Sequence, residues 1–197
     1  MDITAELQVA LLWLAFAGSH IGLSSPRIRN RLRLAGFRGL YSLIAFAIFM
    51  PLIAIYFRNR LQSEHLFCLA RTPGFYYAIY VLMGAAFVLA VAAILQPSPA
   101  SITAGRDATR VVGMARITRH PLMMGFALLA LKHMLVSGQP IDLVFFGGFV
   151  AFSIAGAWYQ DRRMQEEDER FAAFARETPF VPFGVPNRLL GLRELSP

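Results

Sequence analysis

The sequence predicts an all-α membrane protein: a polytopic bundle of about five transmembrane helices with a cytoplasmic amphipathic helix near the C-terminus. Apolar residues make up 56% of the chain and charged residues only 16%, a balance that is unusual for a soluble domain. The apolar residues form runs of about 17 to 22, which is enough to cross a hydrocarbon core of about 30 Å. Lys and Arg lie almost entirely between these runs. We therefore expect a single integral membrane domain that covers residues 1–197.

Each apolar run has its own boundary signals. The first carries no Lys or Arg before it, unlike a cleavable signal peptide, so we expect it to be retained. Pro51 predicts a kink in the second run, and the short turn Gly138-Gln139-Pro140 makes the fourth and fifth an antiparallel pair. A charged, interfacial helix is expected over Arg162–Glu177. The expected spans are 3–23, 39–57, 75–96, 121–137 and 141–159, followed by a tail over 160–197.

The distribution of basic residues predicts the orientation in the membrane. Of the 19 Lys and Arg residues, fifteen fall on the side that holds the tail, three fall on the other side, and Lys132 lies within the fourth span. Basic loops stay in the cytoplasm, so we expect the N-terminus outside and the C-terminus inside, in a bacterial inner membrane. The net charge of +7 then reflects contact with membrane lipid and not with nucleic acid. The sequence leaves a monomer or an oligomer open.

Three histidines in or beside the spans, His20, His120 and His133, are candidate site residues. A single histidine in a span is more often satisfied by a backbone carbonyl, but three in five spans favour a ligand site. Neutral imidazole is a common axial ligand of haem iron. Arg119, beside His120, could pair with a haem propionate or act as a structural anchor.

Helix geometry limits which histidines can share one iron. His120 and His133 are separated by about 20 Å of helical rise, so one of them would have to meet His20 across a helix interface. Depth favours His120, because His20 and His120 both fall near the cytoplasmic face. His133 would reach that depth only if the fourth span were broken or re-entrant.

Several motifs together carry a resemblance to a known family. The run Gly113-Met114-Ala115-Arg116-Ile117-Thr118-Arg119-His120-Pro121 is followed by Gly125 and His133. With it go His20-Ile21-Gly22-Leu23, Gly156-Ala157-Trp158 with Asp161-Arg162-Arg163, and the segment Thr178–Phe183. These motifs resemble the NnrU family of multi-pass membrane proteins, which includes the plant zeta-carotene isomerase. The resemblance covers nearly the whole chain.

The resemblance implies a haem b protein of the bilayer and, in the isomerase branch, rotation of a cis double bond in an apolar polyene that enters from lipid. In that branch the ligating, catalytically required histidines match His20 and His133, which leaves His120 as an alternative ligand or a neighbour of the site. The iron is thought to switch ligands on reduction. This pairing differs from the depth argument, and we rank His133 first because the resemblance is residue-specific. Other members are linked to nitrite and nitric oxide reduction, which implies a non-catalytic accessory role in denitrification as an alternative.

A second resemblance points to a different class of enzyme. Arg119-His120-Pro121 with Gly125, then Glu166-Glu167 and a tail rich in Phe and Pro, is similar to isoprenylcysteine and phospholipid methyltransferases. There the basic loop and the paired glutamates hold S-adenosylmethionine. This chain has Met123 where those enzymes have a tyrosine, and the scheme gives no role to His20 or His133.

Overall fold

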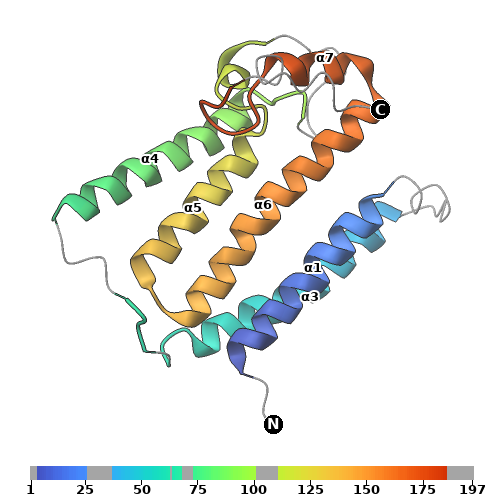
Figure 1. The fold of residues 1–197 in the computed structure, drawn as a ribbon. Helices are drawn as coiled ribbons and strands as arrows, with labels where there is room; N and C mark the ends of the chain where they lie inside the picture. Colours follow the sequence, from blue (N-terminus) through green and yellow to red (C-terminus); the bar gives the residue numbers. More distant parts are fainter. Residues whose placement is uncertain (1–3, 26–36, 63, 68–72, 101–110, 186–197) are drawn as a thin grey trace. The chain divides into compact units, whose positions relative to one another are not determined.

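A computed structural model describes residues 4–25, 37–62, 64–67, 73–100 and 111–185, and within these ranges the secondary structure is entirely helical (Figure 1). The chain forms two compact units. Unit 1 contains residues 1–72 and 133–152, and unit 2 contains residues 73–132 and 153–197. The elements are α1 (Ala5–Ser24), α3 (Phe37–Asn59), α4 (Pro73–Leu95), the 3-10 turn η1 (Gly113–Arg116), α5 (Pro121–Ser137), α6 (Pro140–Glu167) and α7 (Glu169–Glu177).

The predicted helical membrane bundle is confirmed. The helices α1, α3, α4 and α6 are each long and apolar enough to cross a membrane. Large apolar side chains on them are exposed, such as Leu14 at 70% and Phe87 at 69%, as expected of surfaces that face lipid and not water. The apolar helix α5 has 17 residues, at the short end of the spanning range, and its crossing of the bilayer stays a prediction.

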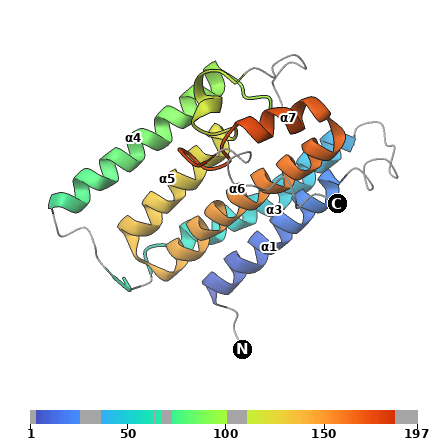
Figure 2. The same ribbon diagram turned by 45° about the horizontal axis from the view of Figure 1, so that its top comes forward.

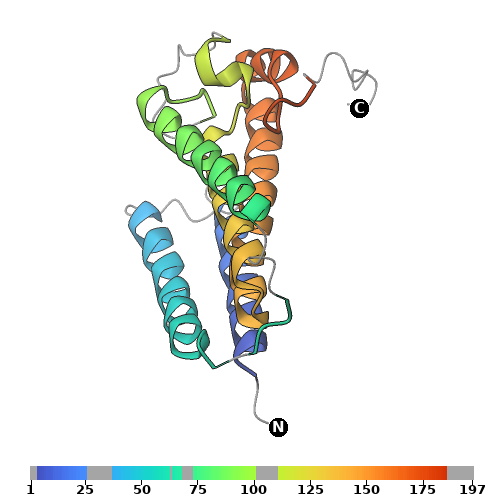
Figure 3. The same ribbon diagram turned by 90° about the vertical axis from the view of Figure 1, so that its left-hand side faces the viewer.

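The core of unit 1 is built around Trp13 on α1. Its indole Nε1 donates a hydrogen bond to the carbonyl of Phe145 on α6 over 3.0 Å. A Cβ on Gly148 would lie 2.3 Å from the indole ring, so a larger residue there would push α6 away from α1. Figure 3 separates α1 from α3, which overlap in Figure 1. The indole also contacts the rings of Phe16, Phe49, Phe145, Phe149 and Phe152.

A buried carboxylate joins three elements of unit 1. Asp142 is 1% exposed and lies in the first turn of α6, where the helix dipole favours a negative charge. The hydroxyl of Tyr56 on α3 donates to it over 2.6 Å, and the hydroxyl of Ser137 at the end of α5 donates to its other oxygen. The carboxylate is therefore satisfied without a cation from the described residues around it.

In unit 2, α4 and α5 come together toward α7 (Figures 1 and 2), and they make a close contact at Gly125, in the second turn of α5. A Cβ on Gly125 would lie 3.0 Å from the carbonyl oxygen of Ala86 and 3.3 Å from the amide nitrogen of Ala90. Both atoms belong to the α4 backbone and cannot rotate away. A small buried cluster of Leu89, Met124 and Ala157 fills the space beside this contact.

The prediction of one separate helix over Arg162–Glu177 is wrong, whereas the membrane span over 141–159 stays a prediction. The helix that holds this span continues as α6 to Glu167, because intrahelical hydrogen bonds do not depend on whether side chains are apolar. The break comes at Asp168, which has extended backbone angles and whose side chain accepts from the amide of Arg170 as an N-cap. The predicted amphipathic character is confirmed in α7, whose buried residues are Phe171, Phe174 and Ala175.

Three segments that carried predictions lie outside the described residues, in whole or in part. They are the arginine-rich segment 26–36, the loop residues 101–110 and the end of the tail over 186–197. The charge-based orientation therefore stays a prediction, and so does the single-domain assignment.

The contact at Gly125 gives a prediction about stability. Gly125→Ala should lower the thermal midpoint in detergent by about 3 °C or more, because the added methyl group meets backbone atoms of α4. The matched control is Gly84→Ala on α4, where a Cβ meets nothing within 4 Å; it should leave the midpoint unchanged or raise it through helix propensity. Equal midpoints for the two variants would contradict this close packing.

Candidate functional site

The loop before α5 is held in place by its own side chains and by the segment that follows α7. The hydroxyl of Thr118 donates to the carbonyl of Phe180 over 2.6 Å and accepts from the amide of His120 over 3.2 Å. The amide of Arg119 donates to the carbonyl of Pro179 over 3.0 Å. Pro121 then begins α5, where a missing N–H costs no intrahelical bond. The backbone at residues 118–120 is thus fixed from both sides.

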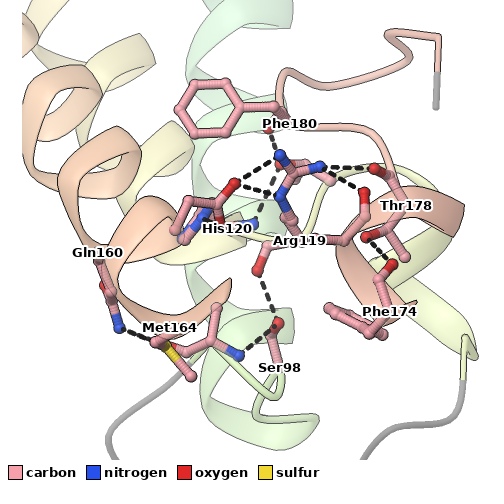
Figure 4. Close-up of polar contacts among 12 residues, drawn as sticks. Ser98, Arg119, His120, Gln160, Met164, Phe174, Thr178 and Phe180 are labelled. Carbon is pink, nitrogen blue, oxygen red and sulfur yellow. Dashed lines mark hydrogen bonds and ion pairs between the residues drawn. The ribbon is translucent and has the colours of Figure 1, made fainter. Parts of the chain in front are cut away.

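Arg119 is almost completely buried, at 3% exposure, and four of the five N–H groups of its guanidinium have protein acceptors (Figure 4). Its Nε and Nη2 donate to Oδ2 of Asp161 over 2.6 and 2.5 Å. Its Nη1 donates to the carbonyls of Thr178 and Ala175 over 2.6 and 3.3 Å. The ring of Phe180 lies 5.3 Å from the guanidinium carbon. These contacts suit a structural anchor, and the pairing of Arg119 with a propionate stays a prediction.

His120 shares the same carboxylate. Its Nε2 lies 2.6 Å from Oδ1 of Asp161, and the residue is 4% exposed. An ionised carboxylate can only accept, so Nε2 donates, and in the neutral imidazole the lone pair is on Nδ1. Arg119 already compensates the charge of Asp161, so this network does not require an imidazolium. In its neutral form this oriented imidazole keeps one acceptor atom, Nδ1, which binds none of the described residues.

A cavity of about 450 Å³ adjoins this network within unit 2. Most of its wall is apolar, and the polar side chains on it include those of Ser98, His120 and Gln160. Ser98 donates to the carbonyl of Arg119 over 2.6 Å and accepts from the amide of Ala100, so its hydroxyl is satisfied. The lining residues are Ala93, Ile94, Pro97, Ser98, Ala100, Arg119, His120, Pro121, Leu122, Met123 and Gln160.

His20 lies in unit 1 and is surrounded by aromatic rings. The ring centroids of Phe16, Tyr41 and Phe152 lie 5.3, 4.8 and 5.2 Å from that of His20. Its Nδ1 is buried and has no hydrogen-bond partner among the described residues. A buried imidazole nitrogen without a partner is costly, which marks this position as one that a ligand could complete.

His133 also lies in unit 1, stacked on Phe146 with ring centroids 4.5 Å apart. Phe146 and Phe152, which contact His133 and His20 respectively, are six residues apart on α6. That spacing corresponds to about 9 Å along the helix and about a third of a turn around it. The structure therefore places the two histidines against different parts of α6, and their ligation of one iron stays a prediction.

The sequence did not identify the acceptor that organises unit 2. Asp161 was part of a motif but had no predicted role, and Thr178 had none. The sequence does hold one signal for Asp161: its carboxylate directly follows the apolar run that ends at Tyr159, and a carboxylate at such a place requires a partner. Glu166, in contrast, pairs with Arg162 at the surface, where both side chains are 68% exposed.

The buried ion pair of Asp161 and the exposed ion pair of Glu166, both on α6, should differ in how much they contribute to stability. Asp161→Asn should reduce the free energy of unfolding by about 3 to 5 kcal/mol, because it leaves the buried guanidinium of Arg119 without a counter-charge. Glu166→Gln removes an exposed pair and should cost about 0 to 1 kcal/mol. Denaturation of the detergent-solubilised protein, followed by circular dichroism, measures both. A similar small loss in the two variants would contradict a central role for Asp161.

Comparison with known proteins agrees with this chain-wide pattern of motifs. The family model "NnrU protein" matches residues 8–193. The chain is 31% identical to the 15-cis-zeta-carotene isomerase, chloroplastic, of Arabidopsis thaliana, and 26% identical to the protein of the same name from Zea mays. Each alignment covers 91% of this chain and 50% of the relative, so the chain spans about half the length of these curated relatives. No solved structure matches. The chain belongs to the NnrU family of membrane proteins.

Proposed function

We propose that this protein is a membrane isomerase that converts a cis double bond of an apolar polyene, such as zeta-carotene, to trans. The observation that carries the proposal is the 31% identity, over 91% of this chain, to a relative named 15-cis-zeta-carotene isomerase. The apolar surfaces of α1, α3, α4 and α6 suit a substrate that dissolves in lipid and reaches the protein laterally.

Haem b is the proposed cofactor, and His20 and His133 are the residues that would hold its iron. His20 suits this role because its Nδ1 is buried without a partner among the described residues and its ring is enclosed by apolar aromatic groups. Neutral imidazole is the donor that haem iron takes in many proteins. A bound haem would supply a redox-active iron that interacts with the polyene. His120 is kept as the alternative ligand through its Nδ1.

The geometry of unit 2 gives the methyltransferase hypothesis less support than the comparisons give the isomerase proposal. It requires Arg119, His120 and Glu166 to hold S-adenosylmethionine. Instead, the side chains of Arg119 and His120 bind Asp161, and Glu166 pairs with Arg162 at the surface. We therefore place the isomerase first, with the S-adenosylmethionine-dependent methyltransferase and the accessory factor for nitrite and nitric oxide reduction behind it.

The choice of membrane and the orientation of the chain in it are also proposals. The bias of Lys and Arg supports a bacterial inner membrane protein with its N-terminus outside and its tail in the cytoplasm. Membrane lipid and an apolar small molecule are the expected partners.

The activity can be tested in a bacterial host that accumulates 15-cis-zeta-carotene. Expression of this chain should increase the trans isomer, as measured by chromatography with absorbance detection. His20→Ala and His133→Ala should reduce conversion at least tenfold. His65→Ala is the matched control, because His65 is exposed and its ring nitrogen lies at hydrogen-bond distance from the carbonyl of Ser137; this variant should retain activity. No conversion by the wild type, at normal membrane levels of the protein, would refute the proposed reaction.

The cofactor can be tested separately from the activity. The purified protein, oxidised and reduced, should show a Soret band that His20→Ala and His133→Ala weaken or shift. His65→Ala should leave the spectrum unchanged. A wild type that stays colourless after haem supplementation would exclude haem. If it then binds S-adenosylmethionine, the methyltransferase assignment replaces the isomerase.

A further inference from the structure

We propose that the cavity beside His120 in unit 2 is a binding site for an apolar molecule that carries a hydroxyl group. This site lies outside unit 1, which holds His20 and His133, and the proposal does not depend on the isomerase activity. It follows from the free polar atoms on the cavity wall, from its apolar lining and from its volume.

The free polar atoms of the wall are hydrogen-bond acceptors. The Nε2 of His120 donates to Asp161, which leaves the lone pair of Nδ1, and Nδ1 binds no described residue. The amide nitrogen of Gln160 donates to the carbonyl of Ala100 and contacts the sulfur of Met164, which fixes the orientation of the amide (Figure 4). Its Oε1 then remains as an acceptor without a described partner. His120 and Gln160, which both line the cavity, therefore each carry an acceptor atom without a described partner, and an O–H group of a ligand can donate to one of them.

The donor must belong to a largely apolar molecule. The rest of the wall is formed mostly by aliphatic side chains, such as Ala93, Leu122 and Met123. At the rim, Ile94 is 73% exposed and Leu122 37%, so an apolar chain can approach across apolar surface. A volume of 450 Å³ equals that of about 15 water molecules at roughly 30 Å³ each, which suits an aliphatic or prenyl alcohol of similar heavy-atom count.

Two other occupants fit less well. A pure hydrocarbon, such as one end of a carotene, would bury both acceptors without a partner, which costs free energy. A metal ion could bind Nδ1 of His120, whose other nitrogen is held by a carboxylate as in many metal sites. However, the described residues contain no group of three His, Cys, Asp or Glu side chains placed to hold one.

The experiment compares 1-dodecanol with dodecane, which differ only by the hydroxyl group. The full-length protein in lipid nanodiscs carries ¹³C-methyl methionine, and the Met123 methyl group on the cavity wall reports occupancy. Dodecanol should shift this resonance saturably and bind at least tenfold more tightly than dodecane, the effect of about one buried hydrogen bond. Met50, an exposed residue on α3, reports general partition into lipid and should not shift saturably.

Two variants test the acceptors. Gln160→Met keeps the length of the side chain but removes Oε1, together with the Nε2 group that donates to the carbonyl of Ala100. The dodecanol affinity should fall about tenfold, whereas dodecane, which makes no hydrogen bond, should bind as before. His120→Phe should have a larger effect; if it fails to fold, Gln160→Met alone decides. Equal affinity for the two ligands would overturn the proposal, as would equal shifts at Met50 and Met123, or an unchanged dodecanol affinity in Gln160→Met. An unshifted Met123 resonance with saturating dodecanol would also overturn it, whatever the isomerase assay shows.

Discussion

The carboxylate of Asp161 is the group on which the described structure of unit 2 depends. One oxygen accepts from the guanidinium of Arg119 and the other from the imidazole of His120, and all three groups are almost fully buried. Burying charged groups costs several kcal/mol per ion, so each of them needs the others. Arg119 in turn donates to Thr178, at the end of α7. A single acidic residue on α6 thereby ties together the loop before α5 and the segment after α7.

This arrangement also fixes the chemistry of His120. Its backbone is held by Thr118 and its Nε2 by Asp161, so the imidazole has one tautomer and one orientation. An imidazole held on both sides keeps its Nδ1 at a constant position relative to the cavity wall, which lowers the cost of ordering on ligand binding. His20 in unit 1 differs from His120, because aromatic rings surround it and no described residue binds its buried Nδ1.

Much of the fold could be predicted because local signals determine it. The bounds of α5 were predicted correctly, because Pro121 begins the helix and Gly138, with a φ of 63°, ends it. The end of α6 was not, because the change from apolar to charged residues after Tyr159 marks a change of environment and not of backbone. The role of Asp161 could not be predicted either. Its partners lie about 40 residues away in sequence, and only tertiary packing selects them.

The three candidate histidines, similar in sequence context, differ in what surrounds their nitrogens. Iron ligation requires a neutral imidazole with an accessible lone pair and apolar walls for the porphyrin. His20 offers apolar walls, and His133 adds a second imidazole in the same unit, stacked on Phe146. His120 is oriented by its carboxylate partner and lines a cavity that Gln160 also lines. A hydroxyl group has one hydrogen to donate, so it can pair with one of the acceptors on these two residues, whereas a hydrocarbon pairs with neither. The polar partners of each ring, and not its depth in the membrane, therefore distinguish a proposed cofactor ligand from a proposed hydrogen-bond acceptor.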